Sequence, residues 1–221
     1  MEAALETQVS PRLAAREPLP CRGLLLGCLW PDRFRDDLAS LHLPARTLAL
    51  LSGEAEGWSP IEAAAVKIAH SLATVLAGRL RAGEAFVEAY RPDVAGLTGL
   101  GPGLTPTGDD LLVGLAAMAC RLAAAGLVER RAAAAYHAVL ADVPLVHTTP
   151  AALALRANAS KGLYPSVLAA FVEALGSAEP PLPSLAERVR LLAATGAHSG
   201  ADLLAGALAL ALGIAFPLEA G

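Results

Sequence analysis

Residues 99–110 read GLGPGLTPTGDD and hold four glycines, two prolines and two adjacent aspartates in twelve positions. Around them, the chain of 221 residues is 55% apolar but only 4% aromatic, so its interior consists mainly of Ala, Leu and Val. Small side chains of this kind suit closely packed helices. We therefore expect a helix-rich protein in which this turn leads into a helix from Asp109 to about Ala125 and has a purpose of its own.

The end of this turn recurs later in the chain. Residues 107–114, TGDDLLVG, and residues 199–206, SGADLLAG, have five of eight positions identical, and a sixth keeps its hydroxyl. The last glycines of the two motifs, Gly114 and Gly206, could let two helices approach closely. No other part of the chain shows this resemblance, which indicates a local pseudo-repeat of two helix starts rather than a solenoid.

Helix capping is one interpretation of the motif. The hydroxyl of Thr107 or Ser199 would accept a hydrogen bond from a backbone N–H of the first turn. The carboxylate of Asp110 or Asp202 would bond back and complement the helix dipole. Such a cap stabilises a helix by about 1 kcal/mol. Capping, together with helix packing at the later glycines, is therefore one explanation of the hydroxyl and acidic positions of the motif.

Capping does not explain Gly108 and Gly200, because glycine inside a helix costs about 0.5–1 kcal/mol relative to Ala. A glycine just inside a helix start leaves the first backbone N–H groups open, and these groups with the helix dipole form an anion site. The upstream turn around Gly101 and Gly103 could also bring its backbone close to a ligand. The motif thus predicts a site for a small anion.

The aspartates add a third interpretation. Asp109 and Asp110 would repel a bare anion, so either Asp110 is engaged in the cap or one of the two holds a cation or a proton donor of the substrate. His198 precedes the second motif and could donate to an anion or act as an acid or base. An anion site, a divalent-metal site, and capping with packing alone all stay open.

The polar island at Thr148 and Thr149, next to His147, is a weaker candidate for the same site. We predict that Asp109 and His198 face the substrate as catalytic groups. The predicted substrate-binding residues are Gly101, Gly103, Thr105, Thr107, Gly108, Asp110, Thr148, Thr149, Ser199, Gly200 and Asp202. No metal ligand and no cofactor is assigned, although a divalent metal remains possible.

The predicted fold class is α+β. Residues 1–58 would form an N-terminal tail and a small β-rich unit, because GLLLGCLW at 23–30 and RTLALLSG at 46–53 are apolar runs of strand length. Residues 59–221 would form the helical region. It opens with Ser59-Pro60-Ile61-Glu62, which has the form of a capping box with proline at the first helical position.

Turn signals divide the helical region into several helices. The first would run to Tyr90 with a break near Gly83, and the later ones are expected at 109–125, 128–141, 151–160, 165–176, 185–195 and 200–216. The prolines of the segment 177–184 predict a loop.

Charge and cysteine content restrict the partners. The formal net charge is −4 with no basic run, which argues against nucleic acid. The uncharged stretch 203–218 is shorter than the roughly 20 residues of a membrane span, and no export signal is recognisable. The three cysteines show no disulfide or zinc spacing. A cytoplasmic protein without membrane or nucleic-acid partners is expected.

GLGPGLTPTGDDLLVG at 99–114 and GAHSGADLLAG at 196–206 resemble the two signatures of the AllH-like family. This family, formerly a domain of unknown function, includes a subunit of bacterial oxamate carbamoyltransferase, in purine and allantoin catabolism. The resemblance implies a reaction that interconverts oxalurate and phosphate with oxamate and carbamoyl phosphate, beside two unlike partner subunits. Small anions such as carbamoyl phosphate or oxamate would be the ligands. A non-catalytic assembly or regulatory subunit, and a metal-dependent hydrolase using the aspartates, are the alternatives.

Overall fold

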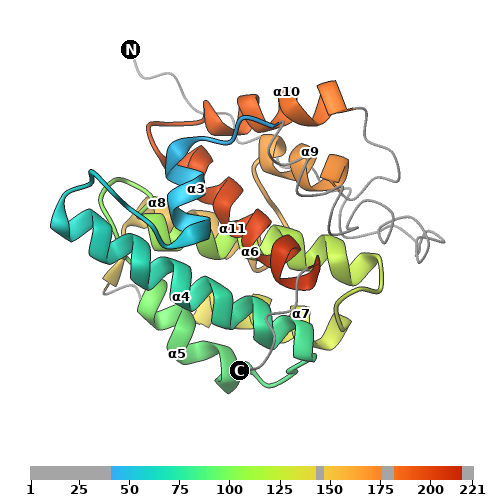
Figure 1. Cartoon of the computed structure of the whole chain (residues 1–221). Coiled ribbons are helices and arrows are strands. Elements are labelled where there is room, and N and C mark those ends of the chain that lie inside the picture. The colour runs from blue at the N-terminus through green and yellow to red at the C-terminus, as the bar shows by residue number, and fades with distance from the viewer. Residues whose placement is uncertain (1–40, 143–146, 176–181, 216–221) are drawn as a thin grey trace, which may run out of the picture.

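The computed structural model of the chain describes residues 41–142, 147–175 and 182–215 (Figure 1). These residues form helices joined by short turns and contain no β-strand. The helices are α3 (Ala45–Ser52), α4 (Pro60–Ala82), α5 (Val87–Leu97), α6 (Thr107–Ala124), α7 (Arg130–Asp142), α8 (Pro150–Ala159), α9 (Ser166–Leu175), α10 (Leu182–Ala193) and α11 (Ser199–Ala215).

The predicted β-rich unit, and with it the α+β class, is wrong for the part of the chain that is described. The run at 46–53 forms α3, whose buried residues Thr47, Ala49 and Leu50 share one helical face. A short apolar run fits a strand and a buried helix equally well by periodicity. The other predicted strand, at 23–30, lies outside the described residues. The described part of the chain is helical, and the division at residue 58 stays a prediction.

The start of α4 is the predicted capping box. Ser59 accepts a hydrogen bond from the Glu62 N–H, its hydroxyl donates to the Glu62 carboxylate at 2.6 Å, and proline occupies the first turn. The helix ends at Gly83, where φ is +74°, so the predicted break is confirmed. The next helix, however, does not end at Tyr90 but continues through Pro92, because its last residues are buried in the core.

Helices α6 and α11 form the centre of the molecule. α6 packs against α4, α5, α7, α8, α9 and α11, and its residues from Thr107 to Ala119 are all buried. In Figure 1, α11 runs through the middle of the fold, with α4 and α5 along one side and α9 and α10 along the other. α6 is enclosed by these helices, whereas residues 102–104 of the turn that precedes it are exposed.

The crossing of α6 and α11 is reciprocal. A Cβ atom placed on Gly114 would lie 2.2 Å from the carbonyl oxygen of Leu203, and one placed on Gly206 would lie 2.2 Å from that of Leu111. Leu111 and Leu203 hold the same position in the two motifs. The two helices therefore meet through equivalent residues, as an approximate two-fold pair, and backbone touches backbone at both glycines.

α4 is long and apolar enough, by length and composition, to cross a membrane. It packs against α3, α5, α6 and α11 in this fold. The absence of a membrane partner stays a prediction.

Candidate functional site

The two motif turns meet in space, and Arg46 of α3 joins them. Its Nε donates to Asp202 Oδ1 at 2.6 Å and its Nη2 donates to Asp202 Oδ2 at 3.0 Å. The same Nη2 donates to Thr107 Oγ1 at 2.6 Å. Thr47 fixes α3 to the second helix start through a hydrogen bond to the carbonyl of Ala201. One guanidinium thus connects the starts of α6 and α11.

Part of the Arg46 guanidinium is unused. Its Nη1 has no hydrogen-bond partner among the described residues, and its side chain is 13% exposed. The guanidinium carbon lies 5.4 Å from the ring centroid of Trp58. A guanidinium that is held in place on one edge and keeps an unused N–H donor is suited to binding a small anion.

Asp110 lies at the same two helix starts, against the hydroxyls of Thr105 and Ser199. Its side chain is fully buried, and neither carboxyl oxygen has a hydrogen bond of good geometry. The hydroxyls of Thr105 and Ser199 lie against it but bond to each other at 3.2 Å. Burial raises the pKa of Asp110 to about 8; the two hydroxyls lower it and the charges of Asp202 and Asp109 raise it further. Burial therefore favours the neutral, protonated form of the Asp110 carboxyl near pH 7.

Neither the Thr107 hydroxyl nor the Asp110 carboxyl forms the predicted cap at α6. The residue before the helix is Pro106, and no side chain caps the first turn. Thr107 instead accepts the hydrogen bond from Arg46. The Thr107 hydroxyl is therefore used in a tertiary contact instead of in a local cap.

Asp109, predicted to face the substrate, is fully engaged inside the protein. Its Oδ1 accepts from Arg156 Nη1 at 3.0 Å, and its Oδ2 accepts from the Gly99 N–H at 2.9 Å and the Thr148 hydroxyl at 2.6 Å. Both charged side chains are at most 1% exposed. Arg156 also donates to Thr98 Oγ1. These contacts make Asp109 the anchor of the glycine-rich turn.

Thr149 supports the same turn from the start of α8. Its hydroxyl accepts from the Ala152 N–H, which caps the helix, and donates to the carbonyl of Leu104. Leu104 itself is 80% exposed at the tip of the turn. Thr148 and Thr149 therefore hold the two sides of the turn, whereas the neighbouring His147 is exposed.

The N–H groups of the two motif glycines are occupied. Gly108 donates to the carbonyl of Leu100 at 2.8 Å, and Gly200 donates to the carbonyl of Thr195 at 2.9 Å. These two amides are therefore not open to a ligand in this structure. The first-turn amides on either side of each glycine have no partner within their helix.

Close packing accounts for the missing side chains instead. A Cβ on Gly108 would lie 1.8 Å from the carbonyl oxygen of Leu97, and one on Gly200 would lie 1.8 Å from that of Leu192. Each motif helix thus starts against the end of the preceding helix. In the turn itself, Gly101 and Gly103 have φ of +101° and +109°, a region that favours glycine.

His198 lies on the exposed rim of the site. Burial raises the pKa of Asp202, whereas Arg46 and, more weakly, the charge of His198 lower it. Glu62 is the nearby acid, and its pKa is lowered first by its hydrogen bonds to Ser59 and also by the charges of Arg46 and His198. His198 is therefore an exposed imidazole in the neighbourhood of the acids around Arg46.

The family of the chain follows from the segment that contains both motifs. Residues 97–211 match the family model described as oxamate carbamoyltransferase subunit AllH. The chain belongs to the AllH family. No curated protein and no solved structure is significantly similar to it. The resemblance carried by the two glycine motifs is thereby confirmed, and a subunit family implies that the chain works with other protein chains.

The AllH region covers most of the site but not all of it. Thr105, Asp110, Ser199 and Asp202 lie within it, whereas Arg46 precedes it. Sequence reasoning missed Arg46 because it lies in an apolar run that gives no sign of a distant acidic partner. Within the described ranges, no three His, Cys, Asp or Glu side chains come together as a metal site requires.

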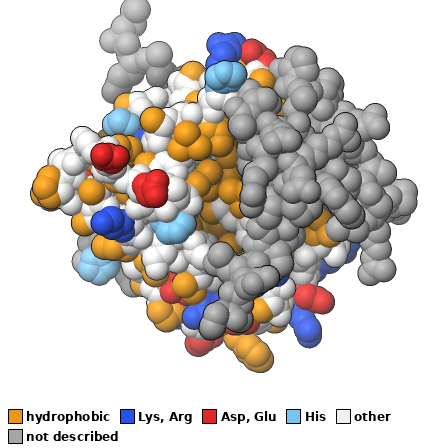
Figure 2. Space-filling view, in the orientation of Figure 1, with side chains coloured by type: hydrophobic (Ala, Val, Ile, Leu, Met, Phe, Trp, Pro, Cys, Tyr) orange, Lys and Arg blue, Asp and Glu red, His pale blue; other side chains and the backbone are white. Residues whose placement is uncertain are grey.

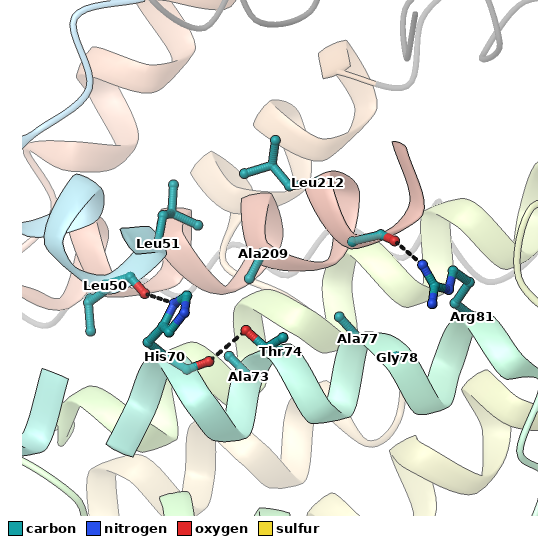
Figure 3. A pocket seen from close by; sticks show the side chains of 11 residues that line it. Leu50, Leu51, His70, Ala73, Thr74, Ala77, Gly78, Arg81, Ala209 and Leu212 are labelled. Atoms are coloured by element: carbon teal, nitrogen blue, oxygen red, sulfur yellow. Dashed lines mark hydrogen bonds between the residues drawn. The ribbon is translucent and has the colours of Figure 1, made fainter. Parts of the chain in front are cut away.

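A cavity of this AllH protein lies elsewhere, between α3, α4 and α11. It is an apolar cavity of about 220 Å³. Figure 3 shows His70 directed toward Leu50 and Arg81 reaching the carbonyl of Gly213 at its other end. On the face shown in Figure 2, hydrophobic side chains gather near the centre. None of the predicted site residues lines this cavity.

Proposed function

We propose that this AllH protein is a subunit of an oxamate carbamoyltransferase-type enzyme and binds a small anion at the joined starts of α6 and α11. The reaction would interconvert oxalurate and phosphate with oxamate and carbamoyl phosphate. Two unlike partner subunits would complete the enzyme. The family description supports the first part, and the arrangement around Arg46 supports the second.

The charge balance around Arg46 is the observation that carries the proposal. Three aspartates beside the two helix starts would ordinarily repel an anion. Asp109 is paired with Arg156, Asp202 is paired with Arg46, and burial favours the neutral form of Asp110. The remaining donors, on Arg46, Thr105 and Ser199, can therefore bind an anion without an unpaired carboxylate directly beside it.

The polar groups around the Arg46 guanidinium have distinct proposed roles. Nη1 of Arg46 takes an anionic oxygen, and the hydroxyls of Thr105 and Ser199 donate further hydrogen bonds. Preorganised donors of this kind stabilise charge that develops in a transition state. His198 at the rim is positioned to donate or accept a proton. Asp109 acts indirectly, by holding the turn that carries Thr105.

The other predicted residues have structural roles in this proposal, because backbone and side-chain contacts already occupy them. Gly108 and Gly200 set the approach of the preceding helices, and Gly101 with Gly103 shapes the turn. Thr107 positions Arg46 rather than touching the anion. The anion is thus held mainly by side chains over the helix starts and less by bare amides.

Calorimetric titration of the full chain with carbamoyl phosphate tests the proposal. Wild type should bind saturably, and Ser199→Ala should weaken binding about tenfold, because one hydrogen bond to a charged group contributes about 1.5–3 kcal/mol. Ser160→Ala, which removes a hydroxyl bonded only to its own helix end, is the matched control.

Two results would count against an anion site in this chain. The first is no binding of carbamoyl phosphate or oxamate to the wild-type chain. The second is an unchanged transfer rate when Ser199→Ala is assembled with the partner subunits. Either result would favour a subunit whose glycine motifs serve assembly alone.

A further inference from the structure

Asp110 and Asp202 hold the same position in the two motifs, and the helices that carry them are related by the approximate two-fold crossing at the motif glycines. Each aspartate is in the first turn of its helix and nearly or fully buried. The surroundings of the two side chains can therefore be compared directly.

The two aspartates differ in the hydrogen bonds that their carboxyl groups receive. Asp202 receives two hydrogen bonds from the Arg46 guanidinium, at 2.6 Å and 3.0 Å. Asp110 receives none on either oxygen, and no cation of the described chain stands where Arg46 stands beside Asp202. A buried polar group without a partner is costly, and proteins retain few of them. The nearby donors of the described chain are therefore the hydroxyls of Thr105 and Ser199, and neither makes a hydrogen bond of good geometry to Asp110.

A ligand donor would reach Asp110 from the side of Thr105 and Ser199. Only the hydroxyls of Thr105 and Ser199 lie against the carboxyl there, both residues are partly exposed, and their mutual bond is long at 3.2 Å. A group that separates these hydroxyls reaches Asp110, while the other end of the same molecule reaches Nη1 of Arg46.

The chemistry of the position selects the kind of group. A ligand carboxylate has no donor for Asp110 and could only accept its single proton, and it would bring a second negative charge towards Asp202 and Asp109, which lie close behind. A primary amide brings two N–H donors and no charge. Its planar NH₂ group can donate hydrogen bonds to Asp110, as the planar guanidinium of Arg46 donates to Asp202.

We propose that Asp110 binds the NH₂ group of a small amide-bearing anion whose charged end lies on Arg46, and so distinguishes carbamoyl ligands from the corresponding dicarboxylates. This inference rests on the proposed function, since it requires an anion at Arg46. It assigns Asp110 as a specificity-determining residue.

Oxamate and oxalate provide the test, because they differ only in an NH₂ group in place of one carboxylate oxygen. Titration calorimetry of the full chain should show wild type binding oxamate up to about tenfold more tightly than oxalate, the effect of one hydrogen bond to a neutral group. Asp110→Asn, whose amide offers oxalate two N–H donors where the neutral Asp110 offers one proton, should reduce or abolish this preference. Asp142→Asn, on an exposed pair with Arg91, should keep it.

Asp110→Ala is a second variant, and it should lose the preference without reversing it; circular dichroism checks that both variants keep their helices. Equal wild-type affinities for the two ligands, or a preference that survives both substitutions, would overturn the assignment of Asp110 while leaving the anion site in place. Failure of the wild-type chain to bind either ligand would overturn this inference and the proposed function together.

Discussion

Substitution of the glycines at the crossing of α6 and α11 should destabilise the protein through backbone contact. The Cβ of Gly206→Ala would lie 2.2 Å from the carbonyl oxygen of Leu111, where ordinary contact begins at 3.4 Å. The two backbones would therefore have to separate by about 1 Å, because neither can rotate away like a side chain. Gly114→Ala makes the equivalent demand from the other helix, against Leu203.

The expected magnitude follows from two opposing terms. Overpacking costs about 1–3 kcal/mol, and a backbone obstacle belongs at the upper end. Replacing glycine by alanine inside a helix returns up to about 1 kcal/mol. Each substitution should thus lower the free energy of unfolding by about 2 kcal/mol, which is roughly 4–8 °C in Tm for a chain of this length.

Urea unfolding followed by circular dichroism measures the effect. One separation of the helices accommodates both methyl groups, so the double variant Gly114→Ala/Gly206→Ala should cost clearly less than the sum of the single variants. Gly78→Ala is the control, since a Cβ there would meet nothing within 4 Å, and it should be neutral or stabilising. Unchanged stability of both crossing variants, or full additivity in the double variant, would refute the reciprocal contact.

Further predictions concern the buried charges. Because burial raises the pKa of Asp110 to about 8 from 3.8, the folded state holds this proton more tightly than the unfolded chain. This group therefore lowers the free energy of unfolding as pH rises from about 4 to about 8, by up to about 1.4 kcal/mol per pH unit. Asp110→Asn should flatten that decline in urea titrations across this range, and an equally steep decline in the variant would contradict the assignment. Arg156→Met leaves Asp109 charged and buried without its partner, and should cost about 3–5 kcal/mol of unfolding free energy. Arg190→Met breaks an exposed pair and should cost at most about 1 kcal/mol, so equal losses in the two variants would contradict the importance of burial.

Local sequence signals predicted much of the helical framework. The capping box before α4 and the glycine end at Gly83 depend on neighbouring residues alone, and both are present. The repeated motif indicated two related helix starts, which do lie together. These features could be predicted because each one is decided within a few residues of chain.

Tertiary contacts decided the features that were missed. The run at 46–53 is a helix because α4 and α11 bury one of its faces, and no local signal distinguishes that from a strand. Gly108 and Gly200 were interpreted as openings for a ligand, but the carbonyls of the preceding helices lie against them. Arg46 reaches an aspartate 156 positions later, a pairing that a single sequence does not contain.

The central claim is that Arg46 holds a small anion over the joined starts of α6 and α11. Calorimetric titration of carbamoyl phosphate into wild type, Arg46→Lys and Arg46→Gln tests it most directly, with Arg79→Gln as the control that removes the same charge elsewhere. The account predicts that Arg46→Gln loses binding by at least about tenfold, that Arg46→Lys recovers only part of it because lysine cannot bridge Asp202 and the anion, and that Arg79→Gln binds as wild type. Folded Arg46 variants that bind carbamoyl phosphate as tightly as wild type would contradict it.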